Sequence, residues 1–239
     1  MAEKENNESK ETKKDEVKEN EAESNQFKVD AKSTLKDTKE GLKNVNIKED
    51  AKGTTGFISG IFKNPLETLK NVVNDKSNKY FKNALFLICI WLIVILLESI
   101  FGVHWTKIYA KNNFLNIFRS LFEPIVAILA FSGIIYFMQK DSKKNLTTNI
   151  TAVTTAMVPI ILVKILSILE LFSSDFVRII TPLNAFARAI TIVFLYFTSK
   201  ELLCEDNDST FVKKFATIQL VYFVVYFIFT FLKIYIPMI

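Results

Sequence analysis

The sequence predicts an all-α membrane protein, a polytopic bundle of about five transmembrane helices behind a disordered, charged N-terminal tail. Two observations support this prediction. Half of the 239 residues are hydrophobic and 23% are charged, yet the two classes are separated along the chain. Residues 1–52 hold 12 lysines against 14 acidic residues, whereas residues 84–239 contain five long apolar runs. Helices of a soluble domain carry both classes on opposite faces, so a soluble domain is excluded.

Residues 1–55 form the predicted tail, which is rich in Lys, Glu, Asn, Ser and Thr. Such a segment cannot bury enough apolar surface to offset the loss of chain entropy, so we expect disorder through residue 55. A loose stripe of Leu35, Leu42 and Val45 leaves a transient helix over residues 31–52 as the alternative. We expect the tail to be available to protein partners, and self-association of the chain stays open.

Residues 56–83 are predicted to be an amphipathic segment on the membrane surface. Asn64 suits a helix N-cap, Pro65 the first helical position, and Glu67 the capping-box position. The apolar side chains of the helix share one face, and we expect this face and three preceding side chains to enter the membrane surface: Leu66, Leu69, Val72 and Val73, preceded by Phe57, Ile61 and Phe62.

Residues 84–239 form the predicted five-helix transmembrane domain. The apolar runs cover residues 84–101, about 121–138, 150–172, 176–197 and 215–237, each close to the ~20 residues that cross a bilayer. Pro159 and Pro182 are expected to kink the third and fourth helices. Eleven lysines flank the spans on one side and five basic residues on the other, which predicts a cytoplasmic N-terminus and an outside C-terminus.

Charged residues inside the spans are the candidate functional site: Glu98, Glu123, Lys164, Glu170 and Arg188. An unpaired charge within the hydrocarbon costs several kcal/mol, so these side chains must pair with one another, snorkel to the membrane surface or face a wet cavity. A substrate-lining or ion-conducting site is the functional interpretation. Interhelical ion pairs that fix the bundle geometry are the structural alternative.

Other functions leave no pattern in this sequence. It has no Ser–His–Asp arrangement, phosphate-binding glycine loop or zinc-ligand spacing, so we expect no enzymatic activity, metal or cofactor. The isoelectric point near 9.0 comes from basic residues beside the spans, and without a nucleic-acid-binding motif we expect no nucleic-acid partner. Membrane lipids are the expected partners of the body.

Two short motifs, in this order of elements, carry a family resemblance. Phe-Lys-Asn-Pro-Leu-Glu-Thr-Leu at residues 62–69 precedes the first span, and Ala-Met-Val-Pro-Ile-Ile-Leu at 156–162, with Pro159, lies in the third. Residues 57–239 thereby resemble the YIP family of Ypt/Rab-interacting, five-span membrane proteins, above all its bacterial branch. The chain lacks the Asp-Leu-Tyr-Gly-Pro segment of the eukaryotic members.

The resemblance implies a scaffold or adaptor in membrane organisation or trafficking, acting through protein partners in a bacterial cytoplasmic membrane. The alternative is a small transporter or permease subunit that uses the intramembrane charges. A lipid-handling protein is a third possibility, which requires a lipid-sized cavity between the helices.

Overall fold

The computed structural model describes residues 24–43, 46–75, 79–105, 113–139 and 144–232, and for 102–105 and 113–116 it describes the backbone alone. Within these ranges every regular element is a helix. The chain divides into two compact units, Met1–Lys43 and Asn44–Ile239. A single helix covers residues 24–43 of the first unit. The second unit contains the candidate membrane spans.

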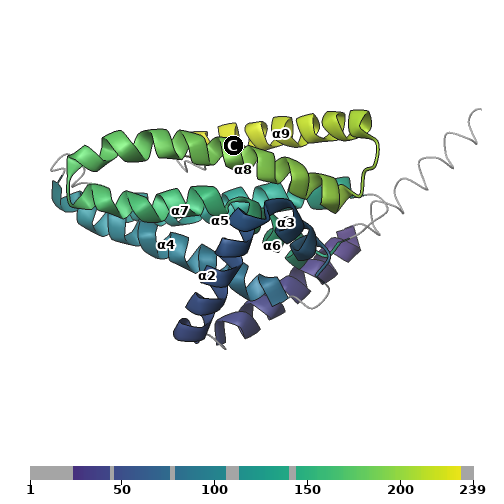
Figure 1. The fold of residues 1–239 in the computed structure, drawn as a ribbon, viewed down its shortest axis with the longest axis horizontal. Helices are drawn as coiled ribbons and strands as arrows, with labels where there is room; N and C mark the ends of the chain where they lie inside the picture. Colours follow the sequence, from purple (N-terminus) through teal and green to yellow (C-terminus); the bar gives the residue numbers. More distant parts are fainter. Residues whose placement is uncertain (1–23, 44–45, 76–78, 106–112, 140–143, 233–239) are drawn as a thin grey trace, which may run out of the picture. The chain divides into compact units, whose positions relative to one another are not determined.

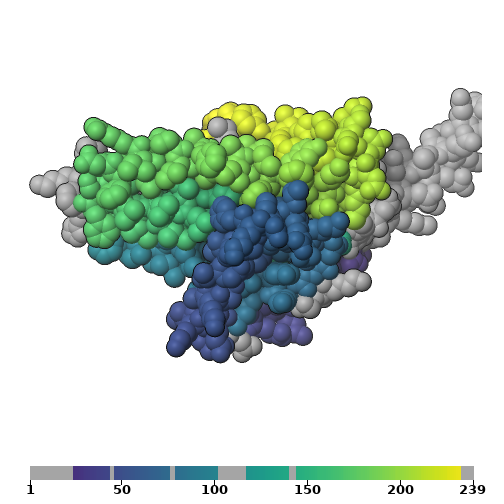
Figure 2. Space-filling view, viewed as in Figure 1, coloured from purple at the N-terminus to yellow at the C-terminus, as the bar shows by residue number. Residues whose placement is uncertain are grey.

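The second unit is built from helices that pack against one another. In chain order they are α2 (Ile47–Lys63), α3 (Pro65–Val73), α4 (Lys79–Trp105), α5 (Asn113–Met138), α6 (Leu146–Ala156), α7 (Val158–Leu166), the 3₁₀ turns η2 (Ser167–Leu171) and η3 (Ser174–Phe176), α8 (Val177–Leu203) and α9 (Asp208–Phe231). α7, α8 and α9 run roughly parallel while α2 runs across them (Figure 1). Figure 2 shows α2 and α3, in dark blue, against the green and yellow surface of the later helices.

Among the described residues, four helices have the length and composition of membrane spans, and a bent pair of helices is a fifth if it counts as one span, in line with the about five that the sequence predicts. The four single helices are α4, α5, α8 and α9, each of 24 to 27 residues. The fifth is the pair formed by α6 and α7 with η2. A helix of this length exceeds the ~20 residues needed to cross the hydrocarbon core. The protein is therefore an integral membrane protein with an all-α fold.

The third span is broken rather than merely kinked. α6 ends at Ala156, α7 begins at Val158, and the axes of the two segments differ by 52°. Pro159 lies in the first turn of α7, where its missing N–H cannot continue the ladder from α6. The kink expected at Pro159 is thus confirmed. α8, in contrast, continues through Pro182 as one helix, and the kink expected there stays a prediction. Pro182 lies in the second turn of α8, where its ring removes a single hydrogen bond near the helix end.

Every residue of α6 is buried, although half of them are polar. Neighbours on several sides, α3, α4, α5 and α8, surround this short helix. Asn145 caps it, accepting a hydrogen bond from the Thr148 N–H at 2.8 Å. The hydroxyls of Thr151 and Thr155 donate to carbonyls one turn back in the same helix. The polar side chains of α6 therefore serve capping and close helix packing, as the threonine-rich sequence predicts.

The predicted boundary at residue 55 is corrected by the structure. Residues 1–23 and 44–45 lie outside the described residues, but residues 24–43 are helical and α2 runs through the boundary from Ile47. Polar contacts hold the first half of α2, including an ion pair to α4. The Asp50 carboxylate accepts from the Asn46 N–H at 2.9 Å and pairs with the Lys82 ammonium at 2.8 Å. The hydrogen bond from Lys82 lowers the pKa of Asp50 below its ordinary value.

The membrane-surface interpretation of α3 is also corrected. Its apolar face packs on α6 and α8, which leaves Leu69, Val72 and Val73 buried. Phe57 and Ile61 of α2 are buried as well. Of the seven apolar side chains expected to enter the membrane, Phe62 and Leu66 are exposed. Protein rather than lipid covers most of this face.

The start of α3 follows the sequence prediction, but its cap does not. The helix begins at Pro65 directly after Asn64. The Asn64 side chain makes no cap bond to the helix backbone, and its amide instead donates to the Glu67 carboxylate at 3.4 Å. In a capping box the Glu67 carboxylate would accept a hydrogen bond from the backbone N–H of Asn64. Here it accepts from the Asn64 side chain instead.

Candidate functional site

A cavity of about 770 Å³ lies between the spans. Its walls come from α4, α5, α7, η2 and α8. Five charged side chains line it, and they are the five that the sequence singles out: Glu98, Glu123, Lys164, Glu170 and Arg188. We call this space the charged cavity. Its volume is in the range of small-molecule sites in proteins.

Helical periodicity explains why these residues share one space. On α4, Trp91, Ile95 and Glu98 lie at spacings of four and three residues, which places them on one face. On α8, Asn184 and Arg188 are likewise four residues apart. Each helix thus turns its polar lining residues away from lipid, Glu98 on α4 and the pair Asn184 and Arg188 on α8. A bilayer that excludes charges imposes this orientation.

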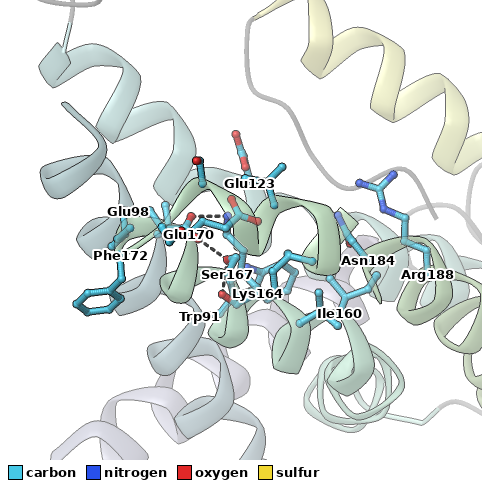
Figure 3. A pocket seen from close by; sticks show the side chains of 17 residues that line it. Trp91, Glu98, Glu123, Ile160, Lys164, Ser167, Glu170, Phe172, Asn184 and Arg188 are labelled. Carbon is cyan, nitrogen blue, oxygen red and sulfur yellow. Dashed lines mark hydrogen bonds and ion pairs between the residues drawn. The ribbon is translucent and has the colours of Figure 1, made fainter. Parts of the chain in front are cut away.

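Glu98 and Lys164 form the central contact of the charged cavity. The Lys164 ammonium makes an ion pair with one carboxylate oxygen of Glu98, and the Ser167 hydroxyl contacts the other. Ser167 also lies 2.6 Å from the Lys164 carbonyl, one turn back in the chain. The side chains remain partly open to the cavity, with 36% of Lys164 and 22% of Glu98 exposed. Figure 3 shows this group joined by dashed lines.

Arg188 lies away from this group. In Figure 3 Arg188 and Asn184 lie together, apart from Glu98 and Lys164. In the described part of the chain, neither Glu170 nor Arg188 has an ion-pair partner within 4.0 Å. Glu123 lines the same space from α5. The charged cavity therefore contains one ion pair, Glu98–Lys164. Glu170 and Arg188, which are opposite in sign, have no ion-pair partner among the described residues.

Eight apolar side chains make up much of the remaining wall: Trp91, Ile95, Ile160, Val163, Leu171, Phe172, Val177 and Ile180. Trp91 is almost fully buried, with 4% of its surface exposed. Such walls lower the local dielectric, which strengthens each electrostatic contact made inside. The arrangement suits recognition of a ligand that carries charge.

The remaining predicted residues lie elsewhere. Asn64, Pro65 and Glu67 stand at the start of α3 and do not line the charged cavity. Pro159 stands at the bend between α6 and α7, directly before the lining residue Ile160. The break therefore shapes one wall of the cavity, while the Asn-Pro-Leu-Glu motif serves the packing of α3.

Several polar or aromatic residues of the site were missed from sequence, among them Trp91, Ser167 and Asn184. Each of these three lies three, four or seven residues from a charged residue on the same helical segment. A search for partners on the helical face of each intramembrane charge would have found them. In the ranges that the structure describes, no group of three or more His, Cys, Asp and Glu could hold a metal ion.

Comparison with known proteins adds no assignment, since no family model, curated protein or solved structure matches the chain. The resemblance to the YIP family stays a prediction. Function has to be argued from the charged cavity itself.

Proposed function

We propose that the protein is a small transporter or permease subunit that holds its solute in the charged cavity, without catalysing a reaction. The convergence of five intramembrane charges on one space is the observation that carries the proposal. If those charges only fixed the helices, each would be expected to pair with another. Glu170 and Arg188 instead face the cavity without an ion-pair partner in the described structure. Intramembrane charges that line a cavity are typical of solute pathways.

The broken third span supports the same proposal. Transporters commonly bind solute beside a discontinuous helix near the middle of the membrane. Here the break at Met157 lies about two turns before Val163 and Lys164, which line the charged cavity. A bent, two-part span is also an element that can change its angle as access alternates. The topology belongs to the proposal, with the N-terminus in the cytoplasm of a bacterium and the C-terminus outside.

Transport can be tested without knowledge of the solute by asking from which side of the membrane a reagent reaches the charged cavity. A transporter exposes its site to water from each side in turn, so a cysteine in the cavity should react with a membrane-impermeant thiol reagent from both sides. The native thiols are first removed by Cys89→Ala and Cys204→Asn. Cys204 has a φ of 48°, a left-handed conformation that asparagine tolerates.

Val163→Cys and Val193→Cys form a matched pair on this background. Val163 lines the charged cavity, whereas Val193 is half exposed on α8 and lies outside the lining. In oriented proteoliposomes we expect Val163→Cys to react from either side and Val193→Cys to stay unreacted within lipid. Reaction of Val163→Cys from one side alone, or from neither, would contradict transport.

A scaffold or adaptor of the YIP type is the second candidate. The helix over residues 24–43 favours it, because it is charged and yet exposes Val29, Leu35 and Leu42. Exposed apolar side chains on a charged helix are the pattern of helix-in-groove recognition. Crosslinking in membranes and mass spectrometry tests it: a protein partner that is captured by the full chain and lost on deletion of residues 1–43 supports the adaptor. Equal capture by both proteins would contradict a role of this helix.

A further inference from the structure

We propose that the charged cavity takes a linear zwitterion, with an ammonium group at Glu170 and a carboxylate at Arg188 and Asn184. A short peptide with free ends and an ω-amino acid both have this chemistry. The inference rests on the proposed solute-binding role of the cavity and names the class of its ligand.

The distribution of charge is the first step. Glu98 and Lys164 neutralise each other, and Ser167 completes the coordination of the Glu98 carboxylate. Glu170 and Arg188 then remain as the lining charges without an ion-pair partner among the described residues. An uncompensated charge in a membrane-embedded site costs free energy. A ligand that pairs with both Glu170 and Arg188 removes this cost at both residues. A ligand with a single charge leaves one of them uncompensated.

The separation of the two charges is the second step. Glu170 belongs to η2, just before the turn that leads into α8. Figure 3 shows Glu170 beside the Glu98–Lys164 group and Arg188 with Asn184 apart from it. The two charges therefore belong to different parts of the lining, and a molecule with a charged group at each end suits both.

The groups at each end fit opposite termini. The Arg188 guanidinium offers parallel N–H donors that match a carboxylate, and the Asn184 amide on the same helical face offers two more. The Glu170 carboxylate accepts hydrogen bonds from an ammonium. Val163, Val177 and Ile180 line the wall together with these polar groups and suit an apolar or uncharged chain.

Binding to the full-length protein tests the class of ligand. Replacing Trp105 by Phe leaves Trp91, which lines the cavity, as the sole tryptophan, so its emission reports on occupancy. The protein in detergent is titrated with trialanine, N-acetyl-trialanine, trialanine amide and 6-aminohexanoate, and thermal unfolding is the second readout. We expect trialanine to bind at least about tenfold more tightly than either blocked peptide, because each block removes one charge pair.

Two substitutions assign the ends. In Glu170→Gln, N-acetylation of trialanine should no longer weaken binding, whereas amidation of its C-terminus still should. In Arg188→Gln, amidation should no longer weaken binding, whereas N-acetylation still should. Glu201→Gln and Arg178→Gln are the matched controls, since both residues lie on α8 outside the lining, and in these variants both modifications should still weaken binding.

Several results would overturn the proposal. They are equal binding of trialanine and its blocked forms, no response to trialanine and 6-aminohexanoate in both readouts, or tighter binding of dihexanoyl phosphatidylethanolamine than of trialanine, which would indicate a lipid site. The thiol-labelling experiment separates this failure from that of transport. Two-sided labelling without zwitterion preference refutes the ligand class alone, and zwitterion binding with one-sided labelling refutes transport alone.

Discussion

Removal of either partner of the Glu98–Lys164 pair should destabilise the protein, and removal of both should cost little more than one. Lys164→Met keeps the length of the side chain without its charge, and Glu98→Gln keeps the shape and an acceptor for Ser167. In either single variant one charge stays in the charged cavity beside apolar walls without its partner. The double variant leaves neither.

The magnitude follows from burial. Breaking a fully buried ion pair costs about 3–5 kcal/mol, whereas an exposed pair contributes about 0–1 kcal/mol. With 22% of Glu98 and 36% of Lys164 exposed, this pair lies between the two cases. We expect each single variant to lose about 2 kcal/mol, and the double variant about 2 kcal/mol, which gives a coupling energy of about 2 kcal/mol.

Steric trapping in bicelles measures the free energy of unfolding within a bilayer-like environment. Losses that simply add, so that the double variant loses as much as the two single variants together, would refute the pairing. The same double variant bears on function. If it folds normally and yet loses solute flux, a purely structural role of the pair is excluded.

Three further predictions concern other parts of the fold. The pKa of Asp50 is lowered in the folded state, so its ion pair with Lys82 stabilises α2 above the ordinary carboxyl pKa and is lost as pH falls through the lowered value. Hydrogen-exchange protection of α2 should therefore be constant from neutral pH down to about pH 4 and decrease below it, and the decrease should be absent in Asp50→Asn, whose protection is low throughout. Asn149→Ala removes a 3.1 Å acceptor from the buried Gln139 amide, and we expect a loss of about 1–3 kcal/mol in unfolding free energy; a loss below about 0.5 kcal/mol would contradict a structural role. Pro159→Ala restores an N–H at the break, so spin labels at the two ends of the α6–α7 pair should move apart in pulsed EPR. An unchanged distance would show that packing alone sets the 52° bend.

The spans and the convergence of charges were predictable because the bilayer imposes both. Long apolar runs have one stable arrangement in lipid, and charges within them must turn inward. Glu98, Glu123, Lys164, Glu170 and Arg188 line one cavity, which is one of the arrangements that the sequence left open. The break before Pro159 was predictable for a local reason, since proline cannot continue the hydrogen-bond ladder.

The arrangement of α2 and α3 was not predictable in the same way. The sequence places Asp50 and Thr54 in a solvated tail. In the structure both are buried, and they contact Lys82 and Asn83, about 30 residues away in sequence. Composition does not reveal such pairings. The apolar face of α3 fits a membrane surface and a protein surface equally well, and only the fold shows that α6 and α8 cover it.

Pairing within the charged cavity was also beyond the sequence. Depth along the spans places Glu98, Glu123 and Glu170 at similar levels, and any of them is a reasonable partner for Lys164. The choice of Glu98 depends on the crossing of α4 and α7 and on the position of Ser167. Neither is encoded in local periodicity.

The sidedness of Val163→Cys labelling tests the central claim most directly, because it asks whether the space around the intramembrane charges is a pathway. Transport through the charged cavity predicts modification by an impermeant reagent applied to either face of the membrane, with Val193→Cys unmodified under the same conditions. Modification from a single face would make the cavity a closed-ended pocket, and protection from both faces would make its charges structural.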